Sequence, residues 1–152
     1  MAAVRVNTMV KMRAQAGCVS HSLADVMVRD MVQSIDEPAE RGDTNKGPTS
    51  TETALSPLIG CTNVIARKCA HKLGIDIGHL RISAVTTFDR CGVTLEEEIE
   101  VPFQSIDLSE KSDGSASESE LQAVAGEVAK FCPLSKLYRR AGTEINGTWG
   151  KV

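Results

Sequence analysis

Alternating apolar and polar side chains predict that the chain begins with β structure. From Val4 to Arg13, apolar residues alternate with polar ones, a period of two that is typical of a half-buried strand. Two shorter apolar runs, Leu23–Val28 and Met31–Ile35, are separated by Arg29-Asp30 and predict an antiparallel pair. Residues 1–37 are therefore expected to form an N-terminal β region. Pro38 ends it because proline has no N–H to donate to a sheet.

The pattern changes to helical spacing over residues 51–73, which we expect to form a first central helix. Pro57 removes a backbone hydrogen bond, so the helix either kinks or begins again with Ser56 as N-cap and Pro57 at its first position. In both cases Cys61 lies near a helix start. A helical projection places Cys69 in the middle of the apolar side and Cys61 at its edge. We expect Cys61 to reach solvent and Cys69 to be buried.

Alternation returns over residues 78–103, which predict a β-hairpin whose strands run from Leu80 and from Val93 to Val101. Arg90-Cys91-Gly92 would form its turn, and the Glu-rich outer face of the second strand would be solvated. Residues 111–117 are polar and rich in Ser, and predict a linker.

A second helix is predicted over residues 117–140. Ser117 and Glu120 form a capping-box pattern at its start, and Pro133 restarts the helix with Cys132 as the cap residue. A final strand is expected over residues 143–152, with Asn146-Gly147 as a turn or bulge. Strands and helices thus occur in separate blocks, which favours a single α+β domain spanning residues 1–152 over a parallel βαβ sheet.

Composition excludes several classes of function. The chain has 152 residues, a net charge of -3 and a pI near 5.6, which argues against nucleic acid or an anionic membrane surface as a partner. Five cysteines at irregular spacing indicate free thiols in a reducing compartment, so we expect a cytoplasmic protein. Arg5, Lys11 and Arg13 precede the first acidic residue, which leaves an organelle transit peptide open.

The thiols themselves suggest chemistry. A thiolate is the reactive form of cysteine, and helix N-terminal amides or nearby cations lower the thiol pKa. Cys61 and Cys132 both lie at predicted helix starts, so one could be oxidised to a sulfenic acid and the other could condense with it. The alternative is that both are small apolar core residues. Cys69 and His71 resemble half of a metal site, but no second pair follows, and we expect no metal.

Three segments together carry a resemblance to a known family. They are Gly47-Pro48-Thr49-Ser50-Thr51-Glu52, then Gly60-Cys61-Thr62, and later Phe131-Cys132-Pro133-Leu134-Ser135. In this order they resemble the OsmC/Ohr family, the osmotically inducible and organic-hydroperoxide-resistance proteins, from about Arg29 to the C-terminus. Three departures mark a divergent member: Ser50 where the family usually has a second proline, Asp43 where it has a second glycine, and Thr62 where its best characterised peroxidases have phenylalanine.

The resemblance implies an α+β fold in which antiparallel sheets wrap around two long central helices in an intertwined homodimer, with the active site at the subunit interface. It implies that Cys61 is the peroxidatic cysteine and Cys132 the resolving one. Glu52 matches a family glutamate that holds an arginine beside the thiolate, and Arg29 is our candidate for that arginine.

The implied substrate is an organic hydroperoxide, held in an apolar pocket that includes Leu58, Ile65 and the partner subunit. A lipoyl-type dithiol would act as reductant, and no cofactor would be needed. Two alternatives remain: a non-enzymatic OsmC-like protein that binds a small ligand with its cysteines reduced, and a structural dimer whose thiols are incidental.

Overall fold

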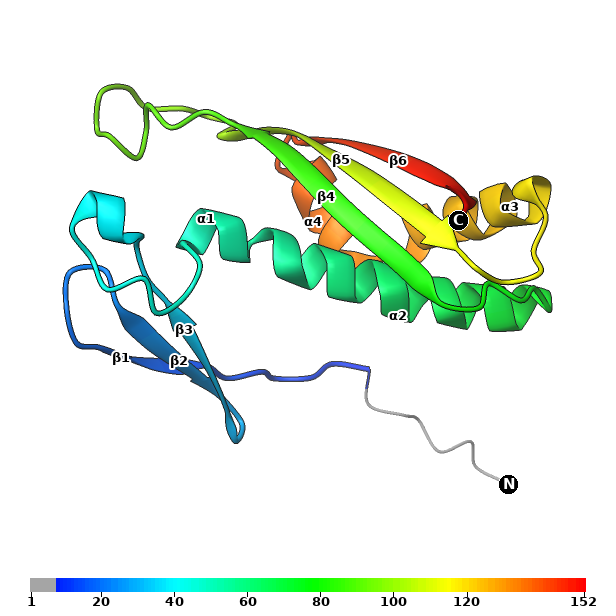
Figure 1. Cartoon of the computed structure of the whole chain (residues 1–152), viewed down its shortest axis with the longest axis horizontal. Coiled ribbons are helices and arrows are strands. Elements are labelled where there is room, and N and C mark those ends of the chain that lie inside the picture. Colours follow the sequence, from blue (N-terminus) through cyan, green and yellow to red (C-terminus); the bar gives the residue numbers. More distant parts are fainter. Residues whose placement is uncertain (1–7) are drawn as a thin grey trace. The chain divides into compact units, whose positions relative to one another are not determined.

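The computed structural model describes residues 8–152, which divide into two compact units at the boundary between Thr53 and Ala54 (Figure 1). The first unit contains a three-stranded antiparallel sheet in the order β1-β2-β3, formed by β1 (Gln15–Cys18), β2 (Ala24–Val28) and β3 (Met31–Ile35). The antiparallel pair predicted around Arg29-Asp30 is confirmed.

The strand predicted from Val4 to Arg13 is wrong where the structure describes it. Residues 8–14 are not in a strand and are exposed, and residues 4–7 lie outside the described part of the chain. Alternating apolar and polar side chains produce a strand only where a neighbouring strand pairs with the backbone and one face of the strand is covered by other side chains. Pairing with β2 begins at Gln15, opposite Met27.

Asp36 organises the loop that follows β3. Its buried carboxylate accepts hydrogen bonds from the Lys46 N–H at 3.0 Å, the Thr44 hydroxyl at 2.5 Å and the Ser22 hydroxyl at 3.1 Å. These donors, the Lys46 N–H first, hold the pKa of Asp36 well below its usual range. The loop contains a 3₁₀ helix, Ala39–Arg41, and leads into α1 (Ser50–Thr53).

The second unit contains the long helix α2 (Leu55–Leu73), which ends at Gly74 in the left-handed conformation, with φ 69°. Of the two alternatives, a kink at Pro57 or a restart with Ser56 as N-cap, the second is wrong. The residue before the helix is Ala54, and Pro57 is the third helical position. Proline is tolerated there because the first four N–H groups of a helix have no partner within the helix. Cys69 is buried as predicted, whereas Leu73 is 44% exposed.

The sheet of the second unit has the order β4-β5-β6, formed by β4 (Leu80–Phe88), β5 (Phe103–Ser112) and β6 (Glu144–Lys151). β4 pairs with β5 antiparallel, and β5 pairs with β6 parallel. In Figure 1 this sheet lies across α2 and the two helices that precede β6.

The predicted second strand of the hairpin, Val93–Val101, is wrong: this segment forms turns, and the partner of β4 is β5. Burial explains why β5, and not Val93–Val101, pairs with β4. Ile106 and Leu108 alternate on the face of β5 toward the helices and are almost fully buried, whereas Val93 and Leu95 remain exposed. The predicted linker also begins too early, because Lys111 and Ser112 still belong to β5.

Two helices connect β5 to β6, α3 (Glu118–Phe131) and α4 (Pro133–Arg140). The capping box of Ser117 and Glu120 is confirmed. Cys132 is the N-cap of α4 and Pro133 is the first residue of that helix, as predicted. Because β6 returns parallel to β5, this part of the chain is a parallel crossover, which the block pattern did not predict. Asn146-Gly147 continue the strand and form neither a turn nor a bulge.

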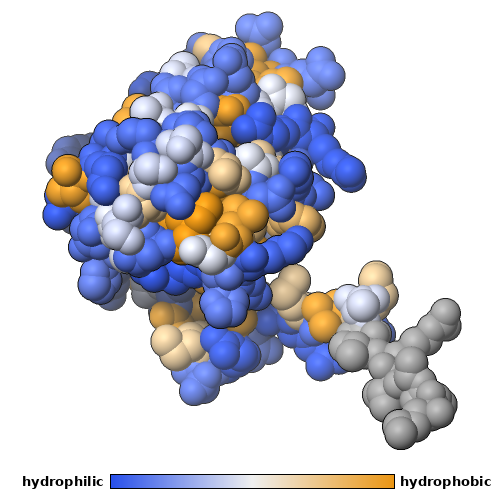
Figure 2. All heavy atoms as spheres, turned by 90° about the vertical axis from the view of Figure 1, so that its right-hand side faces the viewer, coloured by the Kyte–Doolittle hydropathy of each residue, from blue (hydrophilic) through white to orange (hydrophobic). Residues whose placement is uncertain are grey.

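The core of the second unit lies between the sheet and the helices, and includes Leu58, Ala66, Leu121, Val124 and Ile106. Figure 2 looks onto the end where α2 finishes and α3 begins; the surface there is mostly hydrophilic with a hydrophobic patch near its centre. Within residues 8–152, no helix is both long enough and apolar enough to cross a membrane.

Candidate active site

The fold brings Cys61 and Cys132 together, although 71 positions separate them in the chain. Cys61 lies on α2, and Cys132 lies at the junction of α3 and α4. Their Sγ atoms are 3.2 Å apart, with the Cys132 thiol donating to the sulfur of Cys61. Both cysteines are free. A disulfide bond is about 2.05 Å long, so the sulfurs need to approach by only roughly 1 Å to form one.

Cys132 is held as a protonated thiol. Its side chain is fully buried, and this burial, with the neighbouring Cys61 as a smaller cause, raises the pKa of Cys132. The backbone N–H of Ser135 donates to its sulfur at 3.4 Å and opposes the rise in pKa. The cap position of α4 therefore orients the sulfur but does not turn it into a thiolate. A protonated Cys132 can direct its S–H toward Cys61.

Cys61 is half-buried, as the helical projection predicted. It is not at a helix start, however, because it is the seventh residue of α2 and lies in the second turn. Only the first four N–H groups of a helix are free to point at a ligand. The amides at the start of α2 are therefore not placed to lower the pKa of this thiol. The predicted position at a helix start is wrong for Cys61 and right for Cys132, where burial nevertheless raises the pKa.

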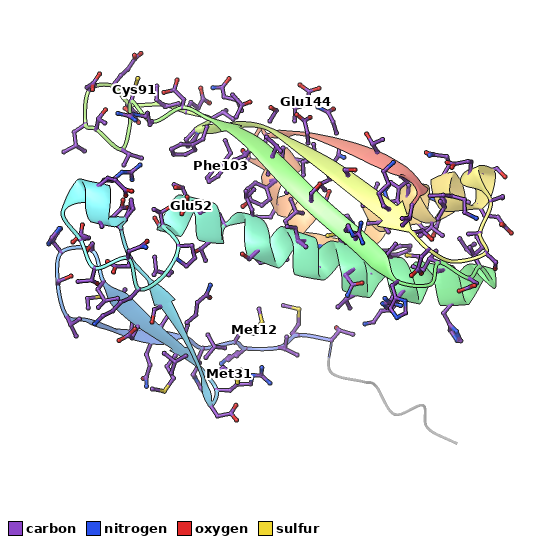
Figure 3. The ribbon with its side chains drawn as sticks, viewed as in Figure 1. Met12, Met31, Glu52, Cys91, Phe103 and Glu144 are labelled. Atoms are coloured by element: carbon purple, nitrogen blue, oxygen red, sulfur yellow. The ribbon has the colours of Figure 1, made fainter. Side chains whose placement is uncertain are left out.

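Aromatic side chains link the start of α2 to the sheet and to α4. The Tyr138 hydroxyl donates to the carbonyl oxygen of Ala54 at 2.7 Å. Phe103, labelled in Figure 3, has its ring centre 5.7 Å from that of Tyr138 and 4.9 Å from that of Phe88. These contacts fix the helix that carries Cys61 against α4 and the sheet.

The predicted apolar pocket needs a correction. Leu58 has no exposed surface and belongs to the core of the second unit, so it does not line an open pocket. Ile65 is half-buried and packs at the edge of the same core.

Glu52 caps α1. Its carboxylate accepts the backbone N–H of Thr49 at 2.8 Å, and the Glu52 N–H donates to the Thr49 hydroxyl at 3.2 Å. This reciprocal pair is a capping box, and its hydrogen bonds from Thr49, the backbone N–H first, lower the pKa of Glu52. The carboxylate is thus ionised at neutral pH.

Arg29 occupies the turn between β2 and β3 with a left-handed backbone, φ 59°, and its side chain is exposed. Glu52 and Arg29 both lie in the first unit, and Cys61 and Cys132 lie in the second. The structure brings the two cysteines together, and the roles of Glu52 and Arg29 beside them stay predictions.

The other cysteines differ in their surroundings. Cys69 is buried, and burial raises the pKa of its thiol. Cys91 lies in the loop between β4 and β5, labelled in Figure 3, where a hydrogen bond to Asp89 raises its pKa. Cys18 is exposed at the end of β1. Among residues 8–152, no three His, Cys, Asp or Glu side chains lie close enough to hold a metal ion.

A second cluster of polar side chains in the same unit was not predicted from the sequence. Glu110 on β5 is 2% exposed, and it lines a cavity of about 180 Å³ together with Ser135, Arg139 and Thr62. The sequence pattern that could have revealed Glu110 is the period of two along Ile106, Leu108, Glu110 and Ser112. All four residues are buried, so the carboxyl group occupies one of a row of inward-facing positions.

Comparison with known proteins supports the resemblance. A family model described as OsmC-like protein matches residues 42–146. No curated relative matches the sequence. An OsmC-like protein from Mycoplasma pneumoniae has a similar structure, with a TM-score of 0.79, 20% identity, and coverage of 94% of this chain and 98% of the other.

Two further solved structures carry names that refer to hydroperoxides. The organic hydroperoxide resistance protein OsmC from Legionella pneumophila has a TM-score of 0.67 at 14% identity, covering 93% of this chain and 98% of its own. The organic hydroperoxide resistance protein OhrB of Bacillus subtilis has a TM-score of 0.66 at 14% identity, with the same coverage. At these identities the likeness establishes the α+β fold.

Proposed function

We propose that this chain, which belongs to the OsmC-like protein family, is a thiol-dependent peroxidase that reduces organic hydroperoxides with Cys61 and Cys132. One observation carries the proposal: the two sulfurs are 3.2 Å apart, with one thiol half-buried and the other buried and protonated. This asymmetry suits a pair in which the accessible sulfur meets the peroxide and the buried sulfur resolves the product.

The proposed reaction has three steps. In the first, the Cys61 thiolate attacks the terminal oxygen of the hydroperoxide; an S–O bond forms and the O–O bond breaks. The alkoxide takes up the proton that the Cys61 thiol lost and leaves as the alcohol. Cys61 is then a sulfenic acid, oxidised by two electrons. In the second step, the Cys132 sulfur attacks the Cys61 sulfur, the S–O bond breaks, and water leaves as the disulfide forms. In the third, a dithiol of the lipoyl type reduces the disulfide by exchange and becomes a disulfide itself.

The order of the roles follows from the burial of the two thiols. A fully buried Cys132 cannot meet a bulky peroxide, and its raised pKa keeps it a poor nucleophile until Cys61 has reacted. After oxidation, the sulfenic acid is already next to Cys132, so resolution requires only a short movement. We therefore assign attack to Cys61 and resolution to Cys132.

Glu52 and Arg29 complete the proposed site. In this scheme the Arg29 guanidinium binds the Cys61 thiolate and Glu52 orients the guanidinium. The ionised state of Glu52, maintained by the N–H of Thr49, suits this role. Arg29→Gln should slow the first step about tenfold or more, because a charge-assisted hydrogen bond contributes roughly 1.5–3 kcal/mol. Arg81→Gln, which removes an exposed arginine on β4, is the matched control and should react at the wild-type rate.

We further propose that the peroxidase is a cytoplasmic homodimer. The sheet of the first unit carries large apolar side chains at exposed positions, with Met31 and Val32 about 60% exposed, and Met12 just before β1 is 90% exposed (Figure 3). Such a concentration is typical of surfaces that a partner covers. Sedimentation equilibrium should give about twice the 16.3 kDa chain mass.

Turnover of cumene hydroperoxide with dihydrolipoamide as reductant tests the function. Cys61→Ser should abolish turnover. Cys132→Ser should consume one equivalent of peroxide and then stop, leaving a sulfenic acid that dimedone traps at Cys61. Cys18→Ser is the control, since Cys18 is an exposed thiol of the other unit, and it should retain wild-type turnover. Unchanged turnover in Cys61→Ser would contradict the proposal and leave the non-enzymatic alternatives.

A further inference from the structure

The cavity beneath β5 and β6 contains a buried carboxyl group that has no role in the thiol chemistry. Glu110 points from β5 toward the helices, in line with Ile106 and Leu108, and is 2% exposed. Its Oε2 atom has no hydrogen-bond partner among the described residues. Burying a carboxyl oxygen without a partner costs free energy, and such an atom in a native fold calls for an explanation.

The surroundings of Glu110 define what could satisfy it. The walls of the cavity are mostly apolar and come from Leu108, Val128, Ile145 and Trp149. Arg139 also lines the cavity, but its guanidinium donates to the Ser135 hydroxyl at 3.3 Å and to the Ile145 carbonyl at 3.1 Å. It forms no ion pair with Glu110. Within residues 8–152 the carboxylate therefore lacks a cationic partner.

Gly147 keeps the space in front of Glu110 open. A Cβ atom at this position of β6 would lie 3.7 Å from Glu110 Oε1 and 3.8 Å from Trp149 Nε1. A larger side chain here would therefore occupy the space beside the carboxyl group. The volume of about 180 Å³ is sufficient for one aromatic ring, since an engineered cavity of about 150 Å³ binds benzene.

We propose that this cavity binds a small, mainly apolar amine, whose ammonium group donates to the carboxylate of Glu110 while its apolar part packs against the walls. An ammonium group supplies both the missing donor and the missing positive charge. A neutral alcohol supplies only a donor, and an anion is repelled. Burial raises the pKa of Glu110 to about 7, so the carboxylate is readily available slightly above neutral pH. The cavity adjoins the cysteine pair, because the Ser135 that lines it also donates its N–H to the Cys132 sulfur, but neither cysteine lines it. The proposed binding does not depend on peroxidase activity.

Benzylamine and benzyl alcohol are suitable probes because they have nearly the same shape and differ in charge. Trp149 is the single tryptophan of the chain and lines the cavity, so its fluorescence reports binding directly. At about pH 8, with the protein kept reduced, we expect benzylamine to bind at least about tenfold more tightly than benzyl alcohol, the ratio expected from one charge-assisted hydrogen bond.

Two variants separate the ammonium contact from the cavity itself. Glu110→Gln keeps the shape and removes the charge, so it should abolish the preference for benzylamine; Glu96→Gln, in the exposed loop after β4, is its matched control and should retain it. Gly147→Val should fold, because valine suits a strand, and should bind neither probe. Cys61→Ser should bind both probes as the wild type does.

The result that overturns the proposal is equal affinity for the two probes, or no fluorescence response to either in the folded wild type. The first would mean that Glu110 does not contact the ligand. The second would mean that the cavity binds neither probe. Neither result would alter peroxidase turnover, so failure here is distinguishable from failure of the proposed function.

Discussion

Oxidation of Cys61 and Cys132 to a disulfide should stabilise the fold, and the size of the effect can be worked out from the structure. The two cysteines are separated by 71 positions, and their sulfurs are already 3.2 Å apart. The bond would therefore close a long loop in the unfolded chain while requiring a movement of only roughly 1 Å in the folded one.

The gain comes chiefly from the unfolded state. Closing a loop of this length lowers the entropy of the unfolded chain enough to raise the free energy of unfolding by about 4 kcal/mol. With a urea m-value of about 2 kcal/mol/M, the unfolding midpoint should rise by roughly 2 M. The short movement in the folded state leaves little strain to offset this gain.

The assay compares urea unfolding of the reduced protein with that of protein oxidised by diamide, at one fixed protein concentration. Intact mass identifies the oxidised form by its loss of two hydrogens, and peptide mapping locates the bond. Cys61→Ser treated in the same way should show no shift, whereas Cys18→Ser should show the full shift. A confirmed Cys61–Cys132 bond with an unchanged or lowered midpoint would contradict this expectation, because strain in the folded state would then equal or exceed the entropic gain.

Three further predictions concern individual side chains. Because burial raises the pKa of Glu110 from 4.5 to about 7, the folded state binds its proton more tightly than the unfolded state, and the free energy of unfolding should fall as pH rises between these values. Since one pKa unit corresponds to about 1.4 kcal/mol, the fall should be about 3 kcal/mol, and denaturant titrations of Glu110→Gln should lack this component. Ser117→Ala removes the cap of α3 and should lower the free energy of unfolding by about 1 kcal/mol, measured by urea unfolding, with a loss below a few tenths contradicting the capping role. Iodoacetamide should label the buried Cys132 at least tenfold more slowly than the exposed Cys18 in time-resolved mass spectra, since burial raises the pKa of Cys132 and restricts access; equal rates would mean that Cys132 is accessible.

Local signals predicted much of the fold. The turn at Arg29-Asp30, the capping box at Ser117 and the cap residue Cys132 depend on neighbouring residues in sequence, and all three are where the pattern placed them. The partner of β4 was mispredicted because both Val93–Val101 and the later strand alternate, and only packing against the helices selects between them. Pairing of β5 with β6 is likewise decided by contacts between distant segments.

The candidate site was predictable in part. Motif resemblance identified Cys61 and Cys132, and the helical projection separated the half-buried Cys61 from the buried Cys69. No local pattern could give the distance between two sulfurs on different helices. Glu110 was missed for a related reason: an acidic residue suggests an exposed position until the strand that contains it is recognised.

The parallel pairing of β6 with β5 has a consequence for the order in which the molecule folds. β4 and β5 are consecutive strands, whereas the Asn146–Asp107 contact between β6 and β5 joins residues 39 positions apart, and long loops close at a greater entropic cost. We expect the helices and the β4–β5 pair to form first and β6 to dock last. Because β6 carries Trp149, its fluorescence in stopped-flow refolding should lag behind the far-UV circular dichroism. The cavity around Glu110 would then be completed only in the final step of folding.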